Sequence, residues 1–231
     1  MCGRYTLQAT HEELAKQFSA DIEDGSLFKP RYNIAPSQSV AVVRLKPDTT
    51  KRELVQLRWG LIPSWAKDPK IAYSTINAKA ETVAVKPAFR SAFRKRRCLI
   101  PASGFYEWQQ QGKQKQPMYI RLRDHHPFAF AGLWEHWDPK DGEPIESCTI
   151  VTTEANEFMQ RIHHRMPVIL TPEDYEVWLD PVVQQLEGLQ YLLRPSPDLL
   201  RRYSAVEMEA YPVSKMVNNP RNDLIQCVEP I

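Results

Sequence analysis

The chain has 231 residues, of which 42% are hydrophobic and 25% are charged, the balance of an ordinary globular protein with a full hydrophobic core. The formal net charge is only +2, which excludes a polyelectrolyte that coats nucleic acid with its whole surface. With 19 prolines against 8 glycines, the composition predicts many short elements joined by rigid turns, and it argues against a glycine-rich phosphate-binding loop.

The N-terminal segment is predicted to be extended, which keeps Cys2 outside any helix. The first helix is predicted to start after Thr10, whose hydroxyl can cap the backbone while Glu13 reaches back in a capping box. Leu14 and Phe18 then lie on one apolar face of this helix.

Two strands and a basic helix are predicted next. Residues 39–44 and 52–59 have strand composition and flank a turn-like Lys-Pro-Asp-Thr-Thr stretch. A helix is predicted over residues 86–97, with one apolar side. Arg90, Arg94 and further cations occupy its other side and its C-terminal end, where positive charge suits the helix dipole.

The middle of the chain is rich in strands, and helices follow. The predicted strands cover residues 98–101, 104–109, 117–123, 128–136 and 148–153. Helices are predicted over residues 153–161 and over 171–179 with Thr171 as N-cap, and an amphipathic segment at 183–193 precedes a short β-like C-terminus. Because strands run consecutively without helices between them, we predict one α+β domain over residues 1–231 with mostly antiparallel sheet.

The cysteine pattern predicts free thiols. Cys2, Cys98, Cys148 and Cys227 form no Cys-x-x-Cys pair, so the spacing suits neither a zinc site nor a disulfide framework, and we predict no metal and no cofactor. The sequence has no basic region followed by an apolar run at its start, and no stretch of about 18 apolar residues. We predict a cytoplasmic monomer without a membrane segment, nucleoid-associated in a bacterium or nuclear in a eukaryotic cell.

Cys2 has a reactivity that no internal cysteine has. An initiator methionine before so small a residue is normally removed, which leaves an amine and a thiol on adjacent carbons. An aldehyde captured by the amine as a Schiff base can then be closed by the sulfur into a five-membered thiazolidine. An α-amino group titrates at about 7.7–8.0 and a thiol at about 8.5, so both nucleophiles are partly available near neutral pH. The alternative is that position 2 carries no function.

Three further residues are candidates for chemistry. Glu107 lies among aromatic residues, which raises the pKa of a carboxyl and suits proton transfer near neutral pH; alternatively it is an edge-strand glutamate in solvent. Of the adjacent His163 and His164, which point in opposite directions in an extended segment, one can face a pocket as a general acid or base and the other is filler. Asn77 either fixes a substrate or is a plain turn residue.

Candidate nucleic-acid contacts are cations and tryptophans. The Arg90 to Arg97 cluster, together with Arg4, Arg161 and Arg165, offers phosphate contacts, although a solvated helix face would look the same. Trp59 and Trp65 lie around a Gly/Pro turn and can stack on bases, although a core position is the commoner fate of tryptophan.

Six segments of the sequence form an ordered set of motifs. They are Met-Cys-Gly-Arg-Tyr at 1–5, Arg-Tyr-Asn-Ile-Ala-Pro at 31–36, Trp-Gly-Leu-Ile-Pro-Ser-Trp at 59–65, Asn-Ala-Lys-Ala-Glu-Thr at 77–82, Arg-Cys-Leu-Ile-Pro-Ala-Ser-Gly-Phe-Tyr-Glu-Trp at 97–108 and Ile-His-His-Arg-Met-Pro-Val-Ile-Leu at 162–170. Taken together, these segments resemble the SOS response-associated peptidase (SRAP) family of abasic-site processing proteins over essentially the whole chain. Any one segment is weak evidence for the family, but their occurrence in this order is highly specific.

The resemblance implies an SRAP fold with a barrel-like core flanked by helices, and a covalent shield of abasic sites in single-stranded DNA. It implies that Cys2 is the nucleophile, that Asn77 positions the cysteine or the sugar, that Glu107 shuttles protons, and that His163 assists proton transfer and reversal of the crosslink. The DNA groove would be surrounded by Arg4, Asn33, Trp59, Trp65, Lys79, Arg90, Arg94 and Arg165. A partner at the replication fork is left open.

Two residues depart from the family pattern. Lys79 stands where the family more often has arginine, so a phosphate contact keeps its charge but loses bidentate geometry. His164 stands where aspartate is common, and a second imidazole does not favour a protonated His163 as a carboxylate would.

Three functions therefore compete. The leading one is a covalent abasic-site sensor, with an abasic-site lyase side activity through the same Schiff base. The second is a cysteine peptidase in which Cys2 attacks an amide with His163 as base, and self-removal of Met1 is its only readily imagined reaction. The third is a non-covalent module that binds intact single-stranded DNA with strong salt dependence.

Overall fold

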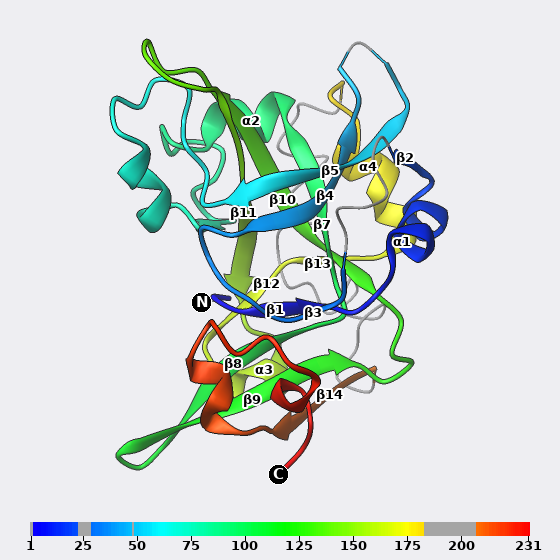
Figure 1. Cartoon of the computed structure of the whole chain (residues 1–231), viewed down its shortest axis with the longest axis vertical. Coiled ribbons are helices and arrows are strands. Elements are labelled where there is room, and N and C mark those ends of the chain that lie inside the picture. Colours follow the sequence, from blue (N-terminus) through cyan, green and yellow to red (C-terminus); the bar gives the residue numbers. More distant parts are fainter. Residues whose placement is uncertain (1, 23–28, 48, 183–206) are drawn as a thin grey trace.

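The computed structural model describes residues 2–22, 29–47, 49–182 and 207–231, and strands dominate it (Figure 1). The strands are β1 (Tyr5–Leu7), β2 (Ala20–Ile22), β3 (Arg31–Ile34), β4 (Ser39–Leu45), β5 (Arg52–Trp59), β6 (Asn77–Lys79), β7 (Arg97–Ala102), β8 (Gly104–Gln111), β9 (Gln114–Leu122), β10 (Phe128–Trp137), β11 (Ile145–Glu154), β12 (Arg165–Pro167), β13 (Ile169–Leu170) and β14 (Met208–Pro212). The α-helices are α1 (His11–Phe18), α2 (Arg90–Lys95), α3 (Glu157–Gln160) and α4 (Tyr175–Leu179), and the 3₁₀ turns are η2 (Pro69–Ser74), η3 (Pro172–Asp174), η4 (Lys215–Asn218) and η5 (Ile225–Cys227).

The larger sheet closes on itself. Its strands follow the order β12-β11-β10-β7-β4-β5-β2, and β5 also pairs in parallel with β11, which joins β4, β5, β7, β10 and β11 into a barrel. The closing pairs are Arg58 with Ser147 and Trp59 with Cys148, and the Gly60 N–H donates to the Cys148 carbonyl at 2.9 Å. Closure removes the two exposed edges that an open sheet would leave.

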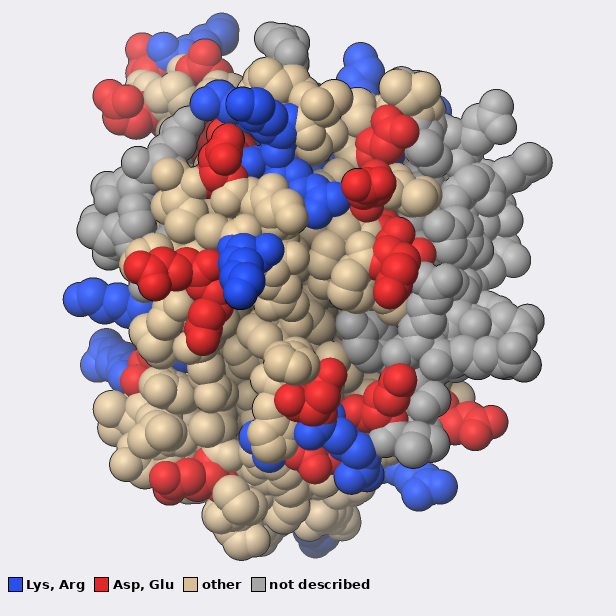
Figure 2. All heavy atoms as spheres, turned by 90° about the vertical axis from the view of Figure 1, so that its right-hand side faces the viewer, with Lys and Arg blue, Asp and Glu red and all other residues tan. Residues whose placement is uncertain are grey.

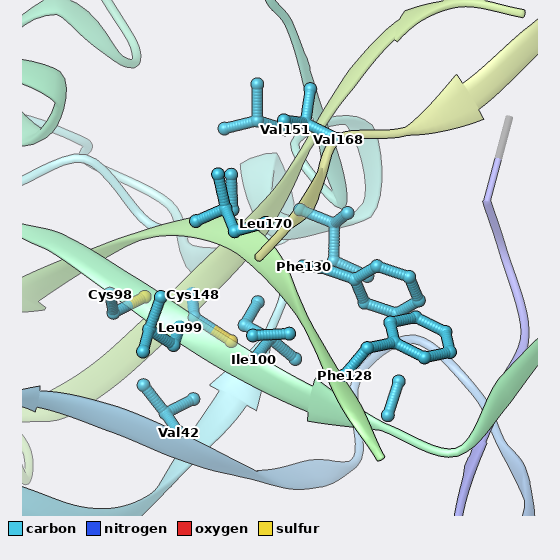
Figure 3. Close-up of a cluster of buried hydrophobic side chains, with 14 of the residues drawn as sticks. Val42, Cys98, Leu99, Ile100, Phe128, Phe130, Cys148, Val151, Val168 and Leu170 are labelled. Atoms are coloured by element: carbon cyan, nitrogen blue, oxygen red, sulfur yellow. The ribbon is translucent and has the colours of Figure 1, made fainter. Parts of the chain in front are cut away.

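Barrel strands are buried on both faces. All residues of β7, and Val40–Arg44 of β4, are buried, so these strands do not show a simple in–out alternation. A single hydrophobic cluster reaches from Cys2 to Met208. Figure 3 shows part of it, where β4, β7, β10, β11 and the segment around β13 contribute Val42, Cys98, Leu99, Ile100, Phe128, Phe130, Cys148, Val151, Val168 and Leu170.

A second, antiparallel sheet carries the N-terminal segment. Its order is β14-β9-β8-β1-β3, with Tyr5 opposite Phe105 and opposite Ile34. In Figure 1 this sheet lies below the barrel, and the β8–β9 hairpin projects from it. The chain end at Cys2 therefore lies at the junction of the two sheets.

The predicted fold class is confirmed. The structure is α+β with mostly antiparallel sheet and a barrel, and parallel pairing is confined among the described strands to β2–β5, β5–β11 and β6–β11. The predicted capping box of α1 is confirmed as well. The Glu13 N–H donates to the Thr10 hydroxyl at 3.3 Å, and the Thr10 N–H donates to the Glu13 carboxylate at 2.7 Å.

Two predicted helices were too long. The helix predicted over residues 86–97 is only Arg90–Lys95, because Pro87 restricts the residue before it and Arg97 already belongs to β7. The helix predicted over residues 153–161 is only Glu157–Gln160. Thr153 stays in β11, and Asn156 is the N-cap, accepting from the Met159 N–H at 2.9 Å.

The last predicted elements are partly confirmed. Thr171 precedes η3 and α4 as expected, but its hydroxyl donates to the Asp174 carboxylate at 2.9 Å and does not cap the backbone. The amphipathic segment predicted at 183–193 lies outside the described residues, and the β-like C-terminus corresponds to β14 followed by η4 and η5. No described helix is both long and apolar enough to span a bilayer.

The turn that follows the closing strand depends on Gly60. Gly60 has a φ of +126°, and a Cβ there would lie 2.7 Å from the Ala72 carbonyl oxygen. We expect Gly60→Ala to lower the free energy of unfolding by about 2–5 kcal/mol through backbone strain and overpacking. Gly112, with a φ of +59° and open space around it, is the control, and we expect about 1 kcal/mol for Gly112→Ala. Urea denaturation measures both; equal losses would contradict the role of the contact with Ala72.

Candidate functional site

Cys2 is buried at the start of the strand that leads into β1. Its side chain is fully buried, and its Sγ lies 4.0 Å from the Arg4 carbonyl oxygen. The Asn77 side-chain amide donates to the Cys2 carbonyl at 2.9 Å. The structure therefore brings together two of the predicted site residues that are far apart in the sequence.

Asn77 owes its position to the barrel. It is the first residue of β6, which pairs in parallel with β11 so that Asn77 lies opposite Ile150 and Lys79 opposite Thr152. The Asn77 Oδ1 is buried and accepts no hydrogen bond from any described residue. A buried acceptor without a donor costs free energy, and it is available to an N–H or O–H group that enters beside Cys2.

Glu107 lies on β8, the strand paired with β1. Its side chain is 3% exposed, so it is not the solvent-facing edge glutamate of the alternative interpretation. Burial raises the pKa of the Glu107 carboxyl. Burial also raises the pKa of the Cys2 thiol, and the Glu107 carboxylate raises it further. Burial and the Glu107 charge thus both favour the protonated thiol of Cys2.

The two histidines do not point apart, and this prediction was wrong. Residues 161–164 form a turn between α3 and β12, so the alternation of an extended strand does not apply. The rings of His163 and His164 are stacked with their centroids 4.4 Å apart. The His163 Nδ1 lies 3.0 Å from the Arg165 main-chain nitrogen and 3.1 Å from the Arg165 carbonyl oxygen, so the Arg165 main chain can hold Nδ1 as an acceptor or as a donor.

The surroundings lower the pKa of both imidazoles. Burial lowers the pKa of His163, the hydrogen bond with the Arg165 main chain opposes this shift, and the charges of Lys115 and Arg165 lower the pKa further. The neighbouring His163 lowers the pKa of the exposed His164, while the Glu107 carboxylate opposes this shift.

The histidine turn and β8 are tied together. The Gln109 side chain donates to the Arg161 carbonyl at 2.9 Å, and Glu107 and Gln109 lie on the same face of β8 because side chains alternate along a strand. Next to the turn is a pocket of about 720 Å³. It is lined by Lys79, Glu154, Ala155, Gln160, His163, His164 and Arg165.

Two residues that were predicted to contact DNA, Trp59 and Asn33, are instead buried. Trp59 is 1% exposed, donates from its indole N–H to the Ile76 carbonyl at 2.9 Å, and packs edge-on against Tyr5, so it cannot stack on a base. Asn33 is fully buried. Its side chain donates to the carbonyls of Val217, Asn219 and Asn222.

Arg4 belongs to the same structural cluster. Its guanidinium donates to the Asn33 side chain at 2.8 Å and to the Val217 carbonyl at 2.6 Å. Asp223 completes the cluster by pairing with Arg31 and accepting from the Asn33 N–H at 2.8 Å. The C-terminal segment is thereby fastened to the strands beside Cys2. Sequence reasoning missed this, although the Asn-Asn-Pro-Arg-Asn-Asp run at 218–223 signals an ordered turn.

The remaining predicted contacts differ in their availability. Lys79, Arg90 and Arg94 are exposed, and Trp65 is 58% exposed. Arg165 is buried and forms an ion pair with Glu81, so its charge already has a partner. Within the Arg90 to Arg97 cluster, Arg96 pairs with Glu135 and the Arg97 guanidinium donates to main-chain carbonyls, so these two cations are structural.

Charge is mixed on the face of the molecule that lies to the right in Figure 1. Figure 2 shows basic and acidic side chains interspersed there, an arrangement that does not favour a polyanion. In the part of the chain that the structure describes, no three His, Cys, Asp or Glu side chains are grouped to hold a metal ion.

The geometry defines a class of protein: a barrel-based α+β fold in which a buried cysteine at position 2 lies beside an amide and a buried carboxyl. The chain belongs to the SRAP family, since the family model described as "SOS response associated peptidase (SRAP)" matches residues 1–220.

Named relatives agree with this assignment. The chain is 46% identical over 232 residues to the abasic site processing protein YoqW of Bacillus subtilis, with 99% of each chain covered. It is 35% identical to the abasic site processing protein HMCES of Gallus gallus, covering 88% of this chain and 67% of that protein. A crystal structure of a protein from Bacteroides thetaiotaomicron matches with a TM-score of 0.86 at 28% identity, covering 100% of both chains.

The buried position of Asn33 predicts a stability effect. We expect Asn33→Ala to lower the free energy of unfolding by about 2–4 kcal/mol, because buried carbonyls lose their donor. Asn218→Ala is the control, since Asn218 is exposed and its side chain accepts from the exposed Trp108 indole N–H at 2.8 Å, while its main-chain contact with Arg4 is kept in the variant. Urea denaturation and hydrogen exchange of the amides at 217–223 measure the effect; a loss no greater than that of the control would contradict it.

Proposed function

We propose that this chain is a covalent sensor and shield of abasic sites in single-stranded DNA. After removal of Met1, Cys2 forms a thiazolidine with the aldehyde of the ring-opened deoxyribose. The observation that carries the proposal is the placement of Asn77, bonded to the Cys2 carbonyl at 2.9 Å, and of buried Glu107, whose charge acts on the Cys2 thiol. The names of the relatives support the substrate class.

The reaction balances as a condensation. The Cys2 amine attacks the C1′ aldehyde to give a carbinolamine, which loses water to form a protonated imine. The thiol then adds to the imine carbon and gives up its proton. Amine, thiol and aldehyde together give thiazolidine and one water molecule, so no oxidant, metal or external cofactor enters the balance.

Glu107 is suited to move protons in both steps. Its raised pKa keeps it protonated closer to neutral pH, so it can protonate the departing hydroxyl of the carbinolamine. The resulting carboxylate can then accept the proton of the Cys2 thiol. Because burial and Glu107 raise the pKa of this thiol, the thiol gives up its proton only when the sulfur attacks the imine.

Asn77 and His163 complete the site in this proposal. Asn77 holds the Cys2 backbone, and its buried Oδ1 accepts a hydrogen bond from the amine or from a sugar hydroxyl. His163, held at Nδ1 by the Arg165 main chain, assists proton transfer at the sugar and in the reversal of the crosslink. The abasic-site lyase activity is proposed as a side reaction of the same imine, in which a base removes the C2′ proton.

The strand itself is proposed to bind to cations and an exposed ring. Lys79, Arg90 and Arg94 offer phosphate contacts, and Trp65 offers a stacking face. Arg165 can contribute where a phosphate competes with Glu81. Because these contacts read no base edge, the binding is independent of sequence, and we propose that a monomer suffices.

The second candidate activity is self-removal of Met1. Cys2 adjoins the chain's own first peptide bond, so cleavage of this bond requires no external peptide to enter the site. Until Met1 is lost the Cys2 nitrogen is an amide and cannot form an imine, so this cleavage is a precondition of the leading proposal.

Intact-mass spectrometry tests the crosslink. The processed protein, incubated with an abasic single-stranded oligonucleotide, is expected to gain the mass of the oligonucleotide minus one water and to resist heat and detergent. Cys2→Ala is expected to give no stable adduct, because an imine without the thiol hydrolyses; borohydride should trap it. An oligonucleotide with a tetrahydrofuran analogue lacks the aldehyde and is the substrate control. Adducts that are equal for wild type and Cys2→Ala without reductant would refute the proposal.

The same measurement tests self-processing. If the site removes Met1, Glu107→Ala is expected to retain Met1 while wild type loses it, because a proton-transfer group contributes about 100-fold or more to such a step. Gln109→Ala, on the same strand and outside the proposed chemistry, is the control. Loss of Met1 from every variant would instead assign the cleavage to a separate aminopeptidase that responds only to the size of residue 2.

A further inference from the structure

Glu81 takes no part in the proposed chemistry, but its carboxylate binds Arg165, and the main chain of Arg165 contacts His163. Its carboxylate accepts from both terminal nitrogens of Arg165, at 2.5 Å to Nη1 and 3.0 Å to Nη2. The Arg165 Nη2 also donates to the Thr152 carbonyl at 2.7 Å. Arg165 is thus fixed by a bidentate ion pair on one side and by β11 on the other, and such paired geometry is specific as well as strong.

The main chain of Arg165 carries this constraint to the imidazole. Arg165 is the first residue of β12 and pairs with Glu154 of β11. Its main-chain nitrogen lies 3.0 Å and its carbonyl oxygen 3.1 Å from the His163 Nδ1. A rotation or shift of Arg165 would therefore change the balance between these two contacts, and that balance determines which His163 nitrogen carries the proton.

We infer that Glu81 is a positioning residue for His163. Through the Arg165 guanidinium it holds the start of β12 in the position that keeps the Arg165 main chain on the His163 Nδ1 and thereby sets the tautomer of the imidazole. Glu81 contacts neither Cys2 nor the substrate in this scheme. The inference deepens the proposed function, because its effect on the reaction rests on the role of His163 there.

A competing interpretation is that Glu81 imitates a DNA phosphate and blocks Arg165 until DNA arrives. The burial of the pair argues against it. The Arg165 side chain is 10% exposed and remains bonded to β11 through Thr152, whereas the Glu81 side chain is 44% exposed. The less accessible partner is the arginine, so the carboxylate reaches inward to hold it.

The charges around His163 determine how its titration responds. Arg165 and Lys115 act on it as cations, His164 stacks on it, and Glu107 acts on His164. Lys79 and Glu154 share its pocket. Removing the Glu81 charge leaves the Arg165 charge uncompensated, which lowers the pKa of His163 further. It also loosens the contact between the Arg165 main chain and the His163 Nδ1.

The first test uses the free protein. Nitrogen-15 NMR of the imidazoles reports tautomer and pKa, and the signals of the 6 histidines are assigned by single substitution. For Glu81→Gln we expect the tautomer populations of His163 to differ from those of wild type, and its titration to move to lower pH. Glu154→Gln removes the same charge from the wall of the same pocket and should behave as wild type. Glu81→Asp, which keeps a carboxylate, should restore most of the wild-type tautomer.

The second test follows the reaction. We expect Glu81→Gln to slow crosslinking and its reversal by about tenfold at saturating DNA, in line with the cost of a misplaced group. Saturating DNA separates this rate from any gain in affinity by an Arg165 that is released from Glu81. A wild-type tautomer in a folded Glu81→Gln, or tighter DNA binding by that variant at a wild-type rate, would overturn the inference. Wild-type protein that forms no adduct would instead overturn the proposed function, and the NMR result would still decide the role of Glu81.

Discussion

The pairing of β11 on both of its edges is the constraint on which the rest of the structure depends. Along one edge it pairs with β10 and then with β12, and along the other with β5 and then with β6. The contact with β5 closes the barrel. The contacts with β6 and β12 place Asn77 on one side of β11 and Arg165, at the start of β12, on the other. The strand that completes the barrel therefore also sets the separation of Asn77 and Arg165.

Burial gives the site its electrostatic character. A thiol and a carboxyl are withdrawn from water together, which raises the pKa of both, and the Glu107 carboxylate further disfavours the ionised thiol. Burial and nearby cations lower the pKa of His163, and His163 lowers that of His164. A site of this kind holds few charges at rest, and it can form them as an incoming aldehyde is converted into a cationic imine.

The predictions from the sequence were correct where they depended on interactions between residues close together in the chain. The capping box at Thr10, the strand composition of the middle segment and the punctuation by proline are short-range effects. The predicted helices were too long because burial of β7 and β11 extended those strands into them, with Arg97 and Thr153 taken into the sheet. The histidine directions were wrong because a turn replaced the assumed strand, and the DNA contact assigned to Trp59 was wrong because the core needed its ring.

By itself, the sequence determined the reactive possibility of an N-terminal cysteine, the α+β class and, through ordered motifs, the family. Those properties depend on residue identity and short spacing. Only the tertiary structure decided that Glu107 is buried, that Asn77 reaches the Cys2 backbone, that Asn33 and Arg4 fasten the C-terminal segment, and that Glu81 holds Arg165. These facts depend on long-range strand pairing, since burial and contact across 75 or more residues are properties of the closed barrel and its neighbouring sheet and of no single segment.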